Sequence, residues 1–146
     1  MANRPPHPLD LRERELEMPP FFGLLGMQVV SVSTEEVVMR MDVPAAMFSP
    51  FGAVFGGAIS ALLDTALGAA VACNIGPYDR TATHALNLNY VTFSRQPALL
   101  AKARVLRLSR TVAAVEGECF TEDGQLIAKA LGTFGIFRDR GGPGGA

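Results

Sequence analysis

The sequence contains little of what small proteins use to hold metals or disulfides. Only two of its 146 residues are cysteine, and Cys73 and Cys119 lie far from any Cys-x-x-Cys spacing. Free cysteine behaves as a small apolar residue when nothing in its surroundings activates it. Both cysteines are therefore predicted to be buried, and we expect no disulfide framework, no metal and no cofactor.

The chain also lacks an excess of charge of either sign. Its formal net charge is -1, and its Lys and Arg residues are scattered along the sequence. Binding to nucleic acid needs a concentrated basic face that neutralises phosphates and releases their counterions. We expect no nucleic-acid partner, and any charged ligand should be met by a few local residues.

No segment is typical of export or of membrane insertion. Residues 1–8 are polar and rich in proline, so the predicted location is the cytoplasm. Residues 52–73 are apolar and long enough to span a bilayer, but Asp64 near their middle would cost about 2.5–3.5 kcal/mol and no Lys or Arg flanks them. This stretch is predicted to be a buried helix, with no membrane partner.

What the sequence does contain is enough apolar material for one core, since 49% of its residues are hydrophobic. One domain is expected over residues 21–138. Residues 1–20 are predicted to be an arm with a short helix at 9–17 that the Pro19-Pro20 pair ends, and the glycine-rich residues 139–146 to be a disordered tail.

The pattern within the domain indicates an α+β fold. A β-hairpin is predicted at 26–43, a loop at 44–54, and a helix with apolar residues on every face at 56–73. Four strands should follow, with links short enough for antiparallel neighbours, at 83–93, 98–108, 111–120 and 126–137. Only an antiparallel sheet that curls around the one long helix would bury such a helix with so few other elements.

Chemistry could take place where this helix begins, at Phe55-Gly56-Gly57. The first amides of a helix have no internal partner and carry the positive end of its dipole, and glycine lets a ligand approach closely. The segment could therefore bind an anion or an oxyanion. Alternatively, the two glycines only allow close packing of the helix start.

A single carboxylate lies two turns further along the helix. Asp64 is the only charged residue between Asp42 and Asp79, and burying it without compensation would be costly. It must meet a partner, water or a cleft. It is either a structural residue bonded to hydroxyls or a second subunit, or a group that activates water or attacks a carbonyl.

The string GAVFGGAISALLDTALGAA at 52–70 resembles the signature of the PaaI-like branch of the hotdog thioesterases. In that family a His-Gly-Gly loop precedes a helix that carries an acid nine residues after the His. The strand THALNLNYVTFSRQP at 83–97 and the segment AKALGT at 128–133 are also similar to the family. The resemblance covers residues 23–137 and implies a hotdog fold that acts as a dimer or a dimer of dimers.

The resemblance also implies roles for particular residues. Asp64 would be the general base or nucleophile, and the Gly56 amide would hold the oxyanion from the opposite subunit, so that the monomer is inactive. Thr83 would orient the attacking water. Phe55 stands where the family has His, and Ser49 where many members have an Asn that donates to the thioester carbonyl. Losing one such donor can lower the rate about 10²- to 10³-fold.

Other residues are weaker candidates for contacts with the substrate. Gly57 extends the helix start, while Phe55 could line an acyl or aryl tunnel or belong to the core, as could Phe48, Phe51 and Phe93. The phosphates of coenzyme A could be met by residues in or near turns, or these residues are solvated charges and hydroxyls at strand ends: Arg95, Arg107, Ser109, Arg110 and Thr111.

Three functions are compatible with these residues. The first is an acyl-CoA or other acyl-thioester hydrolase, for which Asp64 argues. The second is a non-catalytic, regulatory acyl-CoA-binding protein, for which Phe55 and Ser49 argue. The third is a hotdog dehydratase or hydratase, which would require His84 as a catalytic group, although an isolated His is more often structural. Open sheet edges and a shared site predict a homodimer or homotetramer.

Overall fold

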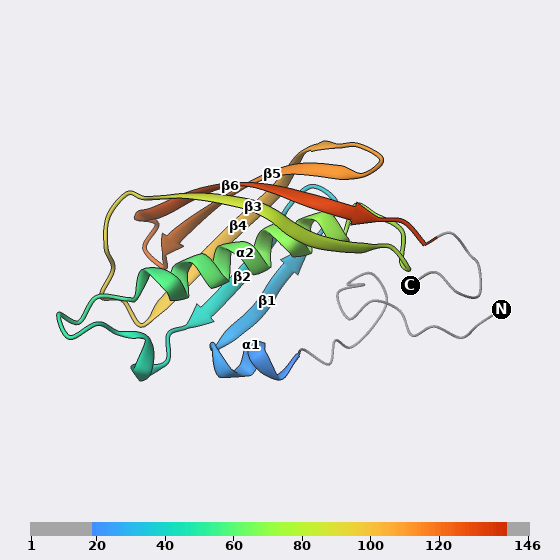
Figure 1. The fold of residues 1–146 in the computed structure, drawn as a ribbon. Coiled ribbons are helices and arrows are strands. Elements are labelled where there is room, and N and C mark those ends of the chain that lie inside the picture. Colours follow the sequence, from blue (N-terminus) through green and yellow to red (C-terminus); the bar gives the residue numbers. More distant parts are fainter. Residues whose placement is uncertain (1–18, 140–146) are drawn as a thin grey trace.

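In the computed structural model, which describes residues 19–139, a six-stranded antiparallel sheet curls around one long helix (Figure 1). This is the hotdog fold that the sequence predicted. The helices are α1 (Pro20–Leu24), a 3-10 turn η1 (Ala45–Met47) and α2 (Gly56–Ala72). The strands are β1 (Met27–Val32), β2 (Val37–Asp42), β3 (Arg80–Tyr90), β4 (Ala98–Leu108), β5 (Val112–Thr121) and β6 (Leu126–Phe137).

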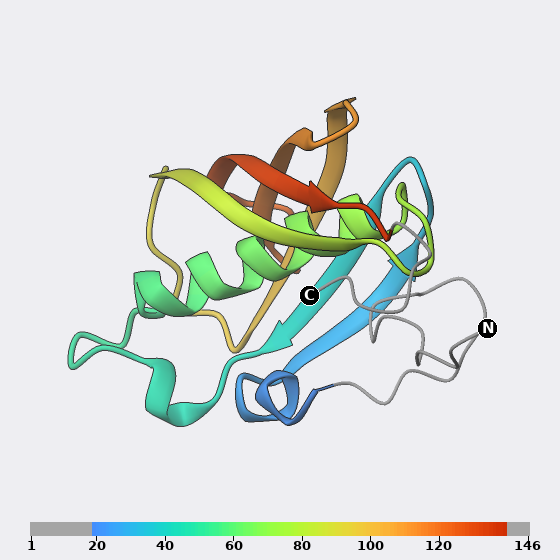
Figure 2. The same ribbon diagram turned by 45° about the vertical axis from the view of Figure 1, so that its right-hand side comes forward.

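The order of strands across the sheet corrects one expectation. It runs β1-β2-β4-β5-β6-β3, so β3 pairs with β6 and not with β4, its successor in the chain. The link from β3 to β4 passes the N-terminal end of α2 (Figures 1 and 2) and is tied there by two backbone hydrogen bonds, Val54 N to Ser94 O and Val43 N to Pro97 O, each 2.8 Å. The edge of β4 that β3 would have occupied is taken by β2.

The Pro19-Pro20 pair lies at the start of a helix that the sequence analysis did not predict. These prolines begin a helix, because proline is compatible with the first turn of a helix, where the missing N–H would have no partner. Phe22 and Leu25 at this short helix are buried against the core. The helix predicted at 9–17 and residues 140–146 of the tail predicted at 139–146 lie outside the described residues.

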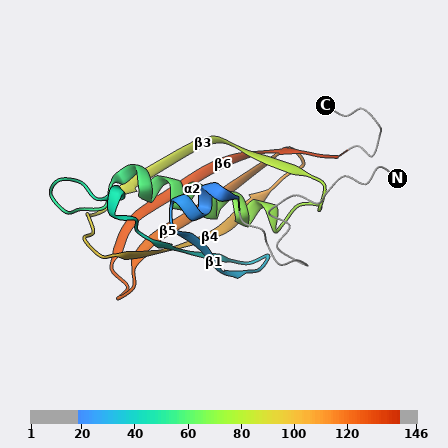
Figure 3. The same ribbon diagram turned by 90° about the horizontal axis from the view of Figure 1, so that it is seen from below.

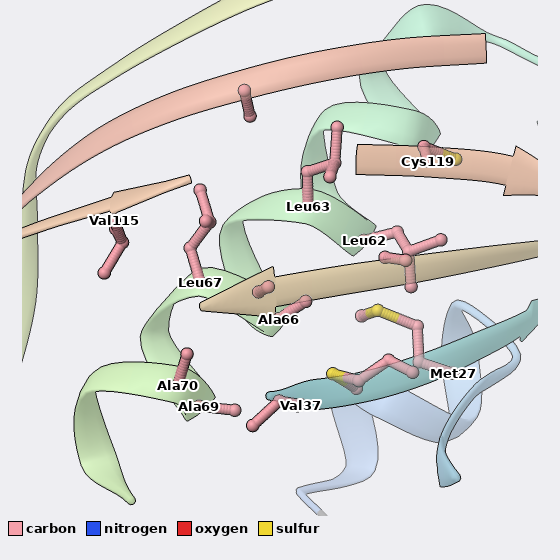
Figure 4. Packing of buried hydrophobic residues seen from close by; sticks show 14 of the residues in the cluster. Met27, Val37, Leu62, Leu63, Ala66, Leu67, Ala69, Ala70, Val115 and Cys119 are labelled. Carbon is pink, nitrogen blue, oxygen red and sulfur yellow. The ribbon is translucent and has the colours of Figure 1, made fainter. Parts of the chain in front are cut away.

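The core lies between α2 and the concave face of the sheet, as Figure 4 shows for the side chains of Leu62, Leu63 and Leu67. These residues are fully buried, with Val115 from β5 among their neighbours in the cluster. Both cysteines are buried, as predicted. Desolvation by burial raises the pKa of the Cys119 thiol to about 12.

One stripe of α2 is not covered, although the helix was predicted to be wrapped on every side. The exposed or half-buried residues recur every three or four positions, which places them on one face: Gly56, Gly57, Ser60, Ala61, Asp64, Thr65 and Gly68. Seen from below, α2 runs along the sheet between the edge strands β3 and β1 (Figure 3). The sheet of one chain therefore leaves Asp64 accessible.

The end of β6 is tied to the loop before β3 by the carboxylate of Asp79. It accepts hydrogen bonds from Arg138 Nη1 at 2.7 Å, the Asp139 amide at 2.9 Å and the Gly76 amide at 3.0 Å. Burial by itself raises the pKa of Asp79, but these bonds outweigh burial and hold that pKa below its ordinary value.

Candidate active site

The start of α2 presents two backbone amides to its surroundings. The Ala58 amide already donates to the Phe55 carbonyl at 3.0 Å, whereas no described residue accepts a bond from the amide of Gly56 or Gly57. Phe55, at the N-cap, provides no side-chain capping bond. These two N–H groups can therefore donate to an oxygen of a ligand.

The two glycines have different surroundings. A Cβ added to Gly57 would meet no atom within 4 Å, so internal packing does not require glycine there. A Cβ added to Gly56 would meet the ring of Tyr90 at 3.4 Å. A Cβ at Gly56 would thus be in ordinary van der Waals contact with Tyr90, whereas Gly57 borders open space that a ligand or a second chain could occupy.

The loop before α2 is closed by short-range hydrogen bonds. Ser49 Oγ accepts from the Ala53 amide at 3.3 Å, and the Ser49 amide donates to the Ala53 carbonyl at 2.7 Å. The Phe55 amide donates to the Met47 carbonyl at 2.8 Å. Ser49 therefore shapes the loop that leads to the helix, and its hydroxyl proton remains available to a ligand.

Asp64 meets Thr83, as the resemblance implied that these two residues would lie side by side. Thr83 Oγ1 donates to Asp64 Oδ1 at 2.7 Å across the gap between β3 and α2. The register of β3 against β6 shifts between Thr83 and Ala85, and such a bulge redirects neighbouring side chains. No Lys or Arg in the range 19–139 forms an ion pair with Asp64, so its second oxygen can accept from water or substrate.

Within one chain, the amides and the carboxylate are too far apart to act on the same carbonyl. Gly56 and Asp64 are eight residues apart in a continuous helix, which corresponds to about 12 Å along its axis. A reacting carbonyl must lie about 3 Å from both its nucleophile and its oxyanion donors. A complete site made from these groups requires two chains.

The aromatic residues near the start of α2 fall into two groups. Phe48 is half-buried and packs against the core, whereas Phe51, Phe55 and Phe93 are exposed, at 84%, 55% and 59%. The guanidinium of Arg95 lies 4.7 Å from the centre of the Phe93 ring, and its Nε donates to the Phe51 carbonyl at 3.3 Å. Arg95 is exposed, and these two contacts hold it beside the helix start.

The other residues proposed to meet phosphates lie elsewhere in the chain. Ser109 and Arg110 occupy the turn after β4, whereas Arg95 precedes that strand. Because β4 has 11 residues, Arg95 lies about 35 Å from Ser109 and Arg110. Ser109 Oγ donates to the Val112 carbonyl at 2.8 Å and closes the β4–β5 turn. Arg107, in β4, and Thr111, in the turn, are exposed.

His84 lies away from this site. Its ring packs edge-on against Phe137, with centroids 6.4 Å apart, and lies directly over Gly135. Phe137 is exposed and alternates with the buried Ile136, which places His84 on the convex face of the sheet. Asp64 lies on the concave side, so the pairing that a dehydratase needs is not formed within the chain.

Sequence reasoning assigned no role to Tyr90, the last residue of β3. Its hydroxyl donates to the Gly56 carbonyl at 2.9 Å. The two residues are 34 positions apart, and no spacing rule in a single sequence indicates such a contact; the similarity of the surrounding strand to the hotdog family was the only signal that pointed to this Tyr.

The sequence matches a family model. The model of the thioesterase superfamily matches residues 51–128, which is more than half of the chain and includes both α2 and β3. The chain therefore belongs to the thioesterase superfamily, and this membership supports thioester hydrolysis as its class of activity. No curated protein sequence matches it.

Solved structures agree with the family assignment. A conserved protein from Pseudomonas aeruginosa is 28% identical, with a TM-score of 0.78 over 82% of this chain and 95% of that one. The phenylacetic acid degradation-related protein of Ralstonia eutropha JMP134 is also 28% identical, with a TM-score of 0.76 over 81% and 90%. A Haemophilus influenzae thioesterase, at 19% identity, has the same fold, with a TM-score of 0.77 over 84% and 87%.

No helix within 19–139 is long and apolar enough to cross a membrane. In the same range, no group of three or more His, Cys, Asp or Glu side chains is arranged to hold a metal ion.

Proposed function

We propose that this protein hydrolyses acyl-CoA thioesters at a site shared by two copies of the chain. Asp64 of one copy activates water or attacks the thioester carbonyl, and Thr83 beside it orients the water. The amides of Gly56 and Gly57 from the other copy stabilise the negative charge that develops on the carbonyl oxygen. Ser49 and Phe55 border the substrate near that helix start, and Arg95 beside it contacts coenzyme A. Ser109 and Arg110, about 35 Å from Arg95 in the same chain, would contact that coenzyme A from the other copy.

The observation that carries this proposal is the 2.7 Å hydrogen bond between Thr83 and Asp64 on the uncovered stripe of α2. A carboxylate in a structural role is usually saturated by partners, whereas this one leaves an oxygen open beside a hydroxyl. That arrangement can hold and deprotonate a water molecule. Membership of the thioesterase superfamily is consistent with this chemistry.

The proposed dimer follows from two features of the chain. The 12 Å separation along α2, estimated from helix geometry, prevents one chain from completing the site. In addition, β3 is an 11-residue edge strand that pairs only with β6 among the described strands, so its other side can pair with a second copy. That strand carries Thr83, which brings the partner chain close to Asp64.

The first test is release of free thiol from acetyl-CoA, octanoyl-CoA, palmitoyl-CoA and benzoyl-CoA, compared between the unmodified protein and Asp64→Asn. We expect the substitution to lower kcat at least about 10²-fold, the scale of general acid–base catalysis. Asp123→Asn, in the exposed β5–β6 turn, is the matched control. Because both cysteines are buried, a thiol reagent should report the released coenzyme A with little background.

A second test addresses the shared site. Asp64→Asn and Gly56→Val chains, each inactive alone, should regain activity when they are co-expressed. Random pairing makes half of the dimers mixed, and each mixed dimer has one intact site of two, so about a quarter of native activity is expected. No recovery from mixed dimers would place the whole site in one chain.

The alternative function is that of an acyl-CoA-binding protein without hydrolysis. It is favoured by Phe55 at the N-cap, which offers no polar group to a substrate, and by Ser49, whose hydroxyl is shorter than the Asn side chain that many members of the family have there. Binding of the four acyl-CoAs without turnover by the unmodified protein would establish this alternative and exclude the hydrolase.

A further inference from the structure

The first turn of α2 is held by a side chain from the far end of the neighbouring strand. The Tyr90 hydroxyl donates to the Gly56 carbonyl at 2.9 Å, while the Tyr90 ring lies over the Gly56 Cα. The ring packs beside Gly56, where an added Cβ would lie in ordinary van der Waals contact, 3.4 Å from two ring carbons and 3.5 Å from the hydroxyl. Ring and hydroxyl together fix the position of this peptide.

The contact acts on an amide that the helix leaves free. The Gly56 carbonyl and the Gly57 N–H belong to one planar peptide group, so a bond that fixes the carbonyl also fixes the direction of the N–H. A donor on the carbonyl also polarises the peptide and makes its N–H a stronger donor. The Gly57 N–H has no acceptor among the described residues and borders open space.

Ordinary helix capping does not account for this arrangement. Phe55 provides no side-chain cap, and Tyr90 leaves half of its surface exposed, so its ring contributes little to burial. Among the described residues, only Tyr90 forms a side-chain hydrogen bond to this turn from another element. The same strand also supplies Thr83, which bonds to Asp64.

We infer that Tyr90 is a positioning residue for the thioester reaction, and that it acts by orienting and polarising the Gly56–Gly57 peptide so that the Gly57 N–H receives the developing oxyanion. This inference rests on the proposed hydrolase function. The strand β3 thereby positions both parts of the site, with Thr83 at the carboxylate and Tyr90 at the amide donor.

The test compares Tyr90→Phe with Tyr78→Phe, which changes the only other tyrosine of the chain, an exposed residue in the turn after α2. Phe keeps the ring and removes only the hydroxyl. With the best substrate of the acyl-CoA panel, Tyr90→Phe should lower kcat about two- to tenfold, the range for one neutral hydrogen bond, with little change in KM. Tyr78→Phe should leave both constants unchanged.

A second measurement reads the peptide directly. In ¹H–¹⁵N spectra of the free protein, the Gly57 amide proton should move upfield in Tyr90→Phe and stay in place in Tyr78→Phe. An unchanged kcat in Tyr90→Phe, or an equal loss of kcat in both variants, would overturn the inference while leaving the hydrolase intact. If the unmodified protein hydrolyses none of the acyl-CoAs, the proposed function fails, and a shifted Gly57 amide would then mark Tyr90 as a structural contact only.

Discussion

Replacing Thr83 by Val tests the most direct contact in the proposed site. Valine keeps the β-branched shape that suits a strand and removes only the hydroxyl that donates to Asp64 at 2.7 Å. Hydrogen bonds to charged groups contribute about 1.5–3 kcal/mol, and the exposure of Thr83 places this one at the lower end. A loss of about 1.5 kcal/mol from the transition state corresponds to a fall in kcat of about tenfold.

The assay is thiol release at saturating acyl-CoA, with kcat and KM determined separately. Thr83→Ser retains the hydroxyl and should keep most of the native kcat. Thr133→Val removes a hydroxyl from an exposed position on the neighbouring strand β6 and should have no effect on turnover. The reasoning is refuted if Thr83→Val turns over at the native rate under conditions in which Asp64→Asn is inactive.

Three further substitutions test the helix start and the sheet. Gly57→Ala should keep or raise the unfolding temperature, since Ala exceeds Gly in helix propensity by up to about 1 kcal/mol, yet lower kcat/KM because the methyl group enters the open space; native turnover would mean that no substrate passes there. Asp79→Asn should lower the free energy of unfolding at pH 7 by about 1 kcal/mol. Because the folded-state pKa of Asp79 is lowered, its contribution is present above the unfolded pKa of about 3.9 and is lost as pH falls through the folded value, so denaturant titrations of the variant and native protein should converge in acid. Gly135→Ala would place a Cβ 2.3 Å from His84 Nε2 and should destabilise the fold by about 1 kcal/mol, which His84→Ala in the same chain should relieve; a failure of relief would show that the clash is with another group.

Much of the architecture could be predicted because its signals are local. The 17-residue helix α2 begins at Gly56 and ends just before the predicted residue 73, since glycines and an apolar run define it. The strands β4, β5 and β6 were predicted within one residue at each end, because alternating residues and short polar turns delimit them. Both ends of β3 were predicted three residues late, because exposed residues hide the alternation in this strand.

The pairing of β3 could not be read from its link to β4. A short link is compatible with hairpin neighbours, but hydrogen bonds from the link to residues 43 and 54 direct it past the start of α2. The prolines at 19 and 20 were similarly ambiguous, because proline both ends helices and starts them. For β3, long-range contacts selected one of two locally acceptable outcomes.

The candidate site divides in the same way. The sequence by itself determined which groups are available, since the glycine pair and the single acid of α2 lie on one helix at a spacing similar to that of hotdog thioesterases. Tertiary structure alone decided what these groups meet, which is Thr83 at Asp64 and Tyr90 at Gly56. It also left one stripe of α2 uncovered, which keeps the carboxylate accessible. Each of these contacts joins α2 to β3, and their geometry depends on the curl of the sheet and the bulge in that strand, which no local pattern encodes.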